Sequence, residues 1–287
     1  MESAGSRMTP TLIEDSFPAC DGLPLFERRW QPAGEPRAEV LLVHGFVEHG
    51  GRHAATAASL TRRCYAVSVM DLRGHGKSAG ARCFVSSFDE YVNDLDAHYD
   101  RVVCRAKGKP VFVLGHSLGG LIAVLWTIRR QPKSSGLILS GPALQVRPQL
   151  FPWLRHLARA GSTLFPRLRL VRMGGRKISR DPAIVAQFRD DPLVFHGRFP
   201  VRTGAEILRA GRLVRAQFEQ VRAPLLILHG AADRVADVEA SQALFQRAEA
   251  TDKTLCLYPE LYHEVLNEPE KERVLADLVQ WLDRRLS

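Results

Sequence analysis

Ser117 stands in the stretch Gly-His-Ser-Leu-Gly, with Gly115 two positions before it and Gly119 two positions after it. The apolar residues in front of this stretch, PVFVL, are typical of a buried strand, and the residues behind it, LGGLIAVLWTI, are typical of a helix. A serine can sit on such a sharp turn only when the residues two places away on each side carry no side chain. The amides and the positive dipole end of the following helix then face the serine and stabilise an oxyanion. The spacing therefore predicts that Ser117 is the nucleophile of an acyl-transfer reaction.

A serine nucleophile needs a general base and an acid that orients this base, and after a turn of this kind the acid precedes the histidine in the chain. The histidines that follow the serine are His156, His196, His229 and His263. His263 is the predicted base, because it follows the last expected strand and precedes the final helix. Asp233 and Asp237 both follow the strand PLLILHG. We select Asp233 as the acid, because a triad acid lies on the loop and Asp237 is one helical turn further on.

An oxyanion hole needs two backbone N–H groups, and two strand ends can supply them. The strand EVLLVHG ends in His44 and Gly45, which turns the amide of Phe46 toward the serine. The amide of Leu118 begins the helix behind Ser117. We therefore predict that Phe46 and Leu118 form the oxyanion hole, in which the loss of one donor typically costs about 3 kcal/mol of transition-state stabilisation.

Two histidine patterns begin like metal sites without completing them. His49 and His53 have the spacing of a helical zinc motif, but two glycines lie between them and no glutamate follows His49. The stretch HEVLNE starts like a zinc motif, but Asn267 stands where that motif has its second histidine. The five cysteines are scattered and form no C-x-x-C pair, which is typical of a protein of the reducing cytoplasm. We expect no metal, and no cofactor is needed by a serine triad.

Six short apolar runs have the composition of buried parallel strands. They cover residues 39–45, 64–71, 110–116, 136–141, 224–230 and 253–259. Segments with helical spacing cover residues 53–63, 88–106, 118–130, 238–250 and 268–286. This alternation predicts the α/β class, with a mostly parallel doubly wound sheet. Ligands of such sheets bind beyond the carboxyl ends of the strands, where Ser117 is expected.

The alternation of strands and helices fails between about residues 142 and 223. This stretch contains Phe-Pro pairs, many arginines and no convincing buried strand, which indicates an insertion on top of the sheet. We therefore expect a first part of the core over residues 1–142, a cap over residues 143–222 and a second part of the core over residues 223–287.

Several stretches together resemble the monoacylglycerol lipase and lysophospholipase branch of the serine α/β-hydrolases. They are HGFVEHGGRH, DLRGHGKSAGAR, GHSLGG, ISRDPAIV, HGAADRVAD and YHEVLNE, and the resemblance extends from about residue 40 to the C-terminus. It implies an α/β-hydrolase fold with a helical cap. It also implies that Ser117, Asp233 and His263 form the triad and that Phe46 and Leu118 form the oxyanion hole.

The resemblance further implies that Glu48 and Arg52 help to shape a polar pocket for a glycerol head group. A salt bridge that braces the loop is the alternative role for these two residues. Some members of the branch carry a second histidine three positions after the catalytic one, where this chain has Leu266. The head-group preference therefore stays open.

The cap carries the basic excess of the chain. Between residues 147 and 215 there are fourteen arginines and one lysine against four acidic residues, while the whole chain has a formal net charge of +9. The apolar residues among them include Leu150, Phe151, Trp153, Leu154, Leu157, Leu164 and Phe165. Such a face can dock on an anionic lipid surface, where each charge adds about 1 kcal/mol, and a solvated face of a soluble lid is the equal alternative. No nucleic-acid partner is expected, because no zinc finger, helix-turn-helix or aromatic-studded sheet is evident.

The location expected from the sequence is the cytoplasm, with a peripheral membrane contact through the cap left open. The N-terminal residues contain no apolar signal-peptide core and carry acidic residues early. Residues 110–128 carry no charge over about the length of a membrane span, but the turn at their centre predicts a strand and a buried helix instead. The oligomeric state is not predicted.

The expected function is the hydrolysis of lipid-like carboxylic esters, with monoacylglycerol cleaved to fatty acid and glycerol as the first hypothesis. A lysophospholipase or a broad-specificity carboxylesterase would use the same machinery. A serine aminopeptidase-like amidase and a non-catalytic ligand-binding protein on a hydrolase fold are further alternatives. We expect activity to rise with pH through the titration of His263, near the ordinary histidine pKa of about 6.5.

Overall fold

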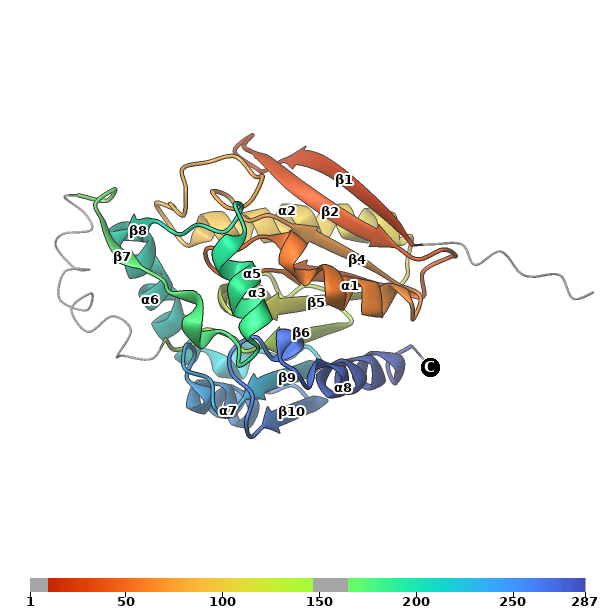
Figure 1. The fold of residues 1–287 in the computed structure, drawn as a ribbon. Helices are drawn as coiled ribbons and strands as arrows, with labels where there is room; N and C mark the ends of the chain where they lie inside the picture. Colours follow the sequence, from red (N-terminus) through yellow and green to blue (C-terminus); the bar gives the residue numbers. More distant parts are fainter. Residues whose placement is uncertain (1–9, 147–164, 287) are drawn as a thin grey trace, which may run out of the picture.

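The computed structural model describes residues 10–146 and 165–286, and an eight-stranded sheet forms the centre of this part of the chain (Figure 1). Its spatial order is β1-β2-β4-β3-β5-β6-β9-β10. The strands are β1 (Thr11–Pro18), β2 (Pro24–Gln31), β3 (Ala38–Val43), β4 (Tyr65–Met70), β5 (Val111–His116), β6 (Gly136–Ser140), β9 (Leu225–Gly230) and β10 (Lys253–Tyr258). The six strands from β4 to β10 are parallel, which confirms the expected α/β class and each of the six expected strands.

The central strands form because their apolar runs can be buried on both faces of a parallel sheet. Every residue of β3, β4, β5 and β9 is buried. The sequence analysis did not predict β1 and β2, which pair antiparallel with each other and extend the sheet at one edge. Most side chains of β1 are exposed, so the hairpin lacks the continuous apolar signal that identified the other strands.

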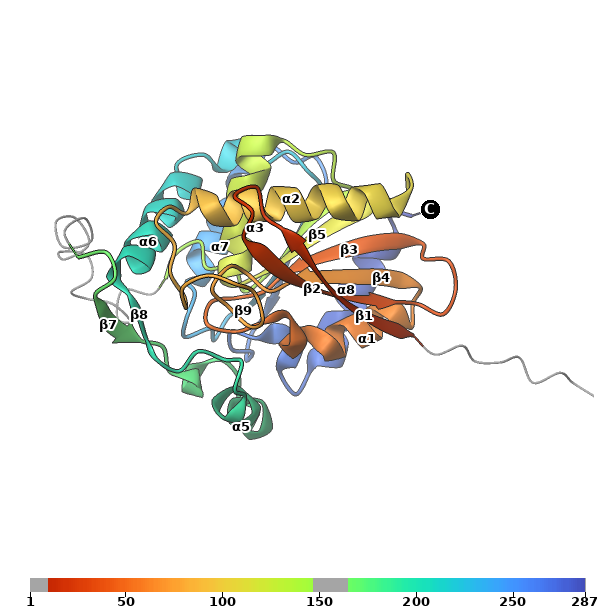
Figure 2. The same ribbon diagram turned by 90° about the horizontal axis from the view of Figure 1, so that it is seen from above.

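Helices cover both faces of the sheet. They are η1 (Gly50–His53), α1 (Ala54–Thr61), α2 (Asp89–Ala106), α3 (Leu118–Arg130), α7 (Val238–Arg247), η5 (Val265–Asn267) and α8 (Lys271–Asp283). One core cluster packs α2, α3 and α7 on one face, and a second cluster packs α1 and α8 on the other (Figure 2). In α2, the buried residues Tyr91, Leu95 and Val102 recur at helical spacing, which explains why this polar segment forms an amphipathic helix.

A separate layer lies between β6 and β9 in the chain and gathers at one end of the sheet (Figures 1 and 2). Its described elements are β7 (Arg169–Arg172), η3 (Gly175–Lys177), α5 (Pro182–Asp190), β8 (Arg198–Pro200), α6 (Val201–Arg215) and η4 (Phe218–Gln220). The sequence analysis found no buried strand here, whereas the structure has a short antiparallel pair, β7 and β8, outside the main sheet. Residues 147–164 lie outside the described residues, and with them six of the seven apolar residues named above, Leu150, Phe151, Trp153, Leu154, Leu157 and Leu164.

Two contacts join this layer to the loop between β3 and η1. The N–H of Phe195 donates to the carbonyl of Val47 at 2.8 Å. His49 Nε2 lies 2.8 Å from the carboxylate of Asp191. The uncharged residues 110–128 form β5 and α3, and no helix in the described ranges is both long and apolar enough to cross a membrane.

Candidate active site

The turn between β5 and α3 holds Ser117 in a backbone conformation that few non-glycine residues adopt, with φ 53° and ψ −116°. A Cβ on Gly115 would lie 2.6 Å from the carbonyl oxygen of Gly119. A Cβ on Gly119 would lie 2.1 Å from the carbonyl oxygen of Val43 in β3. Both distances are far shorter than any real contact, so the two glycines are what allows α3 to pack against β3 with the serine exposed to the cavity above.

Three polar side chains from separate loops meet at this turn. His263 Nε2 lies 2.7 Å from Ser117 Oγ, and His263 Nδ1 lies 2.7 Å from Asp233 Oδ2. The structure therefore brings together the three residues that the sequence analysis selected. Asp237 instead begins α7, where its carboxylate accepts the N–H of Glu239.

The protonation of the pair follows from its burial and charge. Burial alone would lower the pKa of His263, but the negative charge of Asp233 and its hydrogen bond raise this pKa above the ordinary histidine value. Burial opposes ionisation of Asp233, but the charge of His263 and the hydrogen bond from His229 hold the pKa of this carboxyl well below its usual range. The expected titration near the ordinary value of 6.5 is therefore displaced upward, because a buried carboxylate stabilises the imidazolium.

Asp233 has further partners besides His263, and they fix its orientation. Its Oδ1 accepts the backbone N–H groups of Val235 and Ala236 at 2.7 and 3.0 Å. His229 Nε2 lies 3.1 Å from Oδ2, and His229 Nδ1 lies 2.8 Å from the hydroxyl of Ser241. The sequence analysis assigned no role to His229, although its position at the end of β9 shortly before Asp233 was a signal that could have suggested one.

Phe46, Ser117 and Leu118 line one cavity above the turn. Within residues 10–146 and 165–286, the N–H groups of Phe46 and Leu118 form no hydrogen bond. Two unpaired donors that line the same cavity as a serine hydroxyl can donate hydrogen bonds to a developing oxyanion.

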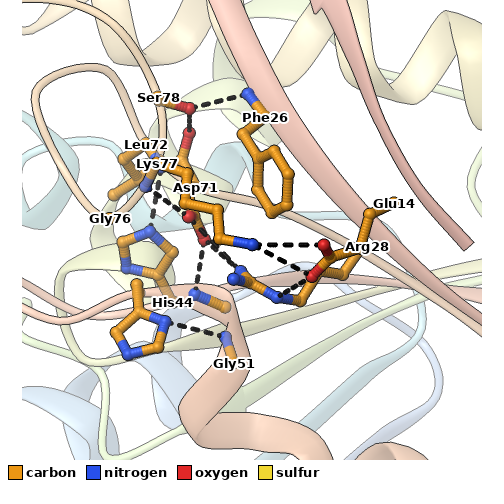
Figure 3. Close-up of polar contacts among 12 residues, drawn as sticks. Glu14, Phe26, Arg28, His44, Gly51, Asp71, Leu72, Gly76, Lys77 and Ser78 are labelled. Carbon is orange, nitrogen blue, oxygen red and sulfur yellow. Dashed lines mark hydrogen bonds and ion pairs between the residues drawn. The ribbon is translucent and has the colours of Figure 1, made fainter. Parts of the chain in front are cut away.

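Asp71, which follows β4, binds the end of the loop that carries Phe46 (Figure 3). Asp71 Oδ1 accepts the N–H of Gly50 at 2.8 Å, and Asp71 Oδ2 accepts the N–H of Lys77 at 2.8 Å. The guanidinium of Arg28 in β2 donates to the same carboxylate at 3.1 Å. One buried carboxylate therefore joins β2 to two loops, and the sequence analysis did not identify it.

Comparisons with known proteins identify the family of this chain. Residues 34–270 match the family described as "Serine aminopeptidase, S33". The chain is 34% identical to the monoacylglycerol lipase of Mycolicibacterium smegmatis, over 96% of this chain and 98% of that protein. It is also 34% identical to the monoglyceride lipase of Homo sapiens, over 99% of this chain and 96% of that protein. The chain belongs to this family of serine α/β-hydrolases.

A solved structure extends the likeness of this serine hydrolase to its whole fold. It is a soluble variant of monoglyceride lipase from Saccharomyces cerevisiae in complex with a substrate analog. The two chains superpose with a TM-score of 0.86 over 100% of each, at 26% identity. The family description names a peptidase, whereas these relatives are named lipases. The residues that line the site are therefore needed to infer which bond is cleaved.

Glu48 and Arg52 of the serine hydrolase lie beside the triad as a buried ion pair, with Arg52 Nη1 at 2.6 Å from Glu48 Oε2. Burial would raise the pKa of Glu48, but the charges of His53 and Arg52 hold it well below its usual range. The pair is therefore ionised and packed inside the protein, behind the surface of the cavity. Leu266, where some members of the branch have a second histidine, is buried among apolar residues that pack with α8.

The cavity above Ser117 is narrow and apolar, with a volume of about 50 Å³. Its lining residues include Val146, Met173, Phe199, Ile207, Leu208 and Val235. In the described part of the chain, no group of three or more His, Cys, Asp or Glu side chains is arranged to hold a metal ion. His49 and His53 instead contact carboxylates, those of Asp191 and Glu48.

Proposed function

We propose that the protein hydrolyses the ester bond of monoacylglycerols and releases a fatty acid and glycerol through an acyl-enzyme on Ser117. The observation that carries this proposal is the hydrogen-bonded series Ser117, His263 and Asp233, with two contacts of 2.7 Å, which opens on an apolar cavity. An apolar wall suits an acyl chain and offers few hydrogen-bond partners to a peptide backbone. The names of the relatives support the same substrate class.

In this mechanism, His263 Nδ1–H donates to Asp233, which leaves the lone pair of Nε2 to accept the proton of Ser117. The serine oxygen attacks the ester carbonyl, and the N–H groups of Phe46 and Leu118 stabilise the resulting oxyanion. The imidazolium of His263 then donates its proton to the departing glycerol oxygen. A water then gives a proton to the same imidazole and attacks the carbonyl of the acyl-enzyme. The imidazolium returns this proton to the oxygen of Ser117 as the fatty acid leaves.

The layer over residues 143–222 acts as a cap in this proposal. Typical ligand pockets have volumes of roughly 300–1,000 Å³, so a cavity of about 50 Å³ admits an acyl chain only after the α6 wall moves outward. Glu48 and Arg52 do not line the cavity, and their ion pair is the bracing arrangement that was the alternative to a role in a glycerol pocket.

The test is the release of fatty acid from 1-monooleoylglycerol by the native protein and by Ser117→Ala at neutral pH. Oleoyl lysophosphatidylcholine, p-nitrophenyl butyrate and an aminoacyl anilide are assayed alongside. Release from the monoglyceride that Ser117→Ala abolishes supports the proposal. Preference for the lysolipid, the short ester or the anilide would replace it with a lysophospholipase, a carboxylesterase or an amidase. Failure to react with a fluorophosphonate would indicate a binding protein.

We also propose that the cap contacts an anionic membrane surface and that the protein is otherwise cytoplasmic. Phe165 and Leu168 expose 66% and 49% of their surface, which is unusual for large apolar side chains. Arg167 and Arg169 lie beside them and are exposed. Apolar residues that insert and basic residues that pair with lipid phosphates are the combination that binds membrane interfaces.

Sedimentation with vesicles tests this contact. Binding to vesicles of phosphatidylserine and phosphatidylcholine, but not of phosphatidylcholine alone, is expected for the native protein. Arg167→Gln is expected to weaken binding about fivefold, since one basic residue contributes about 1 kcal/mol. Leu12→Ser is the matched control for Leu168→Ser, because Leu12 is 51% exposed on β1, away from the cap. Equal effects of the two leucine substitutions would refute the contact.

A further inference from the structure

Glu264 directly follows the catalytic histidine in the chain, and its side chain points away from the triad into a buried ion pair. Its two carboxylate oxygens accept two hydrogen bonds from the guanidinium of Arg52, at 2.8 and 2.9 Å. Asn267 Nδ2 donates to the same carboxylate at 2.8 Å. Two parallel hydrogen bonds between planar groups fix both distance and orientation, so the position of Glu264 is tied to that of Arg52.

Arg52 contacts a second carboxylate, which belongs to the loop of the oxyanion hole. Its Nη1 also donates to Glu48 Oε2 at 2.6 Å, and Glu48 Oε1 accepts the backbone N–H of Gly45 at 2.6 Å. Gly45 precedes Phe46, which lines the cavity above Ser117. A continuous series of contacts therefore runs from the backbone at the oxyanion hole, through Glu48, Arg52 and Glu264, to the backbone of His263.

These three side chains are shielded from water. The exposed fractions of Arg52, Glu48 and Glu264 are 7%, 4% and 4%. Phe188 of α5 covers the guanidinium, with its ring centre 4.8 Å from Arg52 Cζ. Charges in such a position interact strongly and tolerate little change in geometry, because no water can replace a lost partner.

We propose that Arg52 and Glu264 are positioning residues for the reaction at Ser117. They hold the histidine loop, residues 259–264, and the oxyanion loop, residues 44–49, at a fixed separation. The inference rests on the proposed function only in requiring an acyl-transfer reaction, and it is independent of the head group. It assigns the guanidinium to the alignment of the catalytic groups instead of to direct contact with the glycerol. Its effect is therefore expected on every ester that the protein cleaves.

The experiment compares Glu264→Gln with the native protein on two substrates, 1-monooleoylglycerol and p-nitrophenyl butyrate, which lacks glycerol. A misplacement of catalytic groups by about 1 Å can cost on the order of 100-fold in rate. We expect kcat to fall by roughly 10- to 100-fold on both substrates, by the same factor and with little change in KM. Rates are referred to the concentration of sites titrated by a fluorophosphonate, so that a loss of folded protein does not enter them.

Glu39→Gln is the matched control. Glu39 is buried and paired with Arg29 at 2.7 Å, but it lies near the start of β3, at the end opposite to the oxyanion loop. It receives the same substitution in a buried glutamate–arginine pair, which is held by one hydrogen bond instead of two, and we expect native kcat on both substrates. A similar loss in Glu39→Gln and Glu264→Gln would show a general effect of breaking buried pairs and would overturn the proposal.

The remaining outcomes are also decisive. A loss confined to monooleoylglycerol would make Arg52 and Glu264 a head-group site, and native kcat on p-nitrophenyl butyrate would exclude a positioning role. If Glu264→Gln yields no titratable sites, Glu264→Asp keeps the charge but shortens the side chain, and the same equal loss is expected. If the native protein cleaves only the nitrophenyl ester, the proposed function fails, and the effect of Glu264→Gln on that ester still decides this proposal.

Discussion

The substitution Gly119→Ala tests how closely the nucleophile turn is packed against the strand that carries the oxyanion loop. A Cβ at this position would lie 2.1 Å from the carbonyl oxygen of Val43 and 2.6 Å from that of His44. Both oxygens belong to backbone at the end of β3, so no side chain can rotate to relieve the contact. The start of α3 must therefore move away from β3, and Leu118 moves with it.

The magnitude follows from this geometry. Forcing extra atoms into a closely packed site typically costs 1–3 kcal/mol, and backbone contacts of this length place Gly119→Ala at about 3 kcal/mol. At roughly 2–4 °C per kcal/mol, the midpoint of thermal unfolding should fall by about 6–12 °C. Relief of the contact needs a shift of about 1 Å between the amides of Leu118 and Phe46, which is expected to lower kcat about 100-fold.

Thermal unfolding and the hydrolysis of p-nitrophenyl butyrate measure the two effects. Gly34→Ala is the control, because a Cβ on the exposed Gly34 would have no atom within 4 Å. We expect it to leave kcat unchanged and stability within about 1 kcal/mol of native. Native unfolding temperature and native kcat in Gly119→Ala would refute the packing argument for the glycine pair.

Three further predictions follow from the site. In a pH series, kcat/KM should rise with pH through a pKa above 6.5, because the base must be neutral and the pKa of His263 is raised. A midpoint below 6.5 would contradict the role of the Asp233 charge. Asp233→Asn should lower kcat by about 10⁴-fold and move the remaining activity to lower pH, as pre-steady-state and pH–rate measurements can show. Ile207→Trp, which fills the apolar cavity, should reduce the hydrolysis of monooleoylglycerol while sparing p-nitrophenyl butyrate, and equal losses would exclude Ile207 from the acyl wall.

The parallel core and the nucleophile turn could be predicted because both depend on local pattern. The apolar run that forms most of β5 must be buried. Glycines two positions before and after Ser117, between a strand pattern and a helix pattern, indicate the turn. His263 and Asp233 are distant in sequence, but each follows a strand of the same parallel sheet, and parallel strands end at one edge. By contrast, β1 and β2 lie at an edge with many polar side chains, so their burial pattern is weak.

The contacts beneath the triad could not be predicted, because the sequence offers several equivalent partners. Glu264 and Glu268 both follow His263, and arginines are abundant in this chain. The short helix η5 lies between the two glutamates. Glu264 pairs with Arg52 of η1, and Glu268 pairs at 2.6 Å with Arg180 of the layer between β6 and β9. Which carboxylate meets which arginine depends on the path of a single helical turn, and composition carries no information about that path. The loop that follows β10 therefore contacts both Arg52, beside the loop of Phe46, and Arg180, in the layer between β6 and β9.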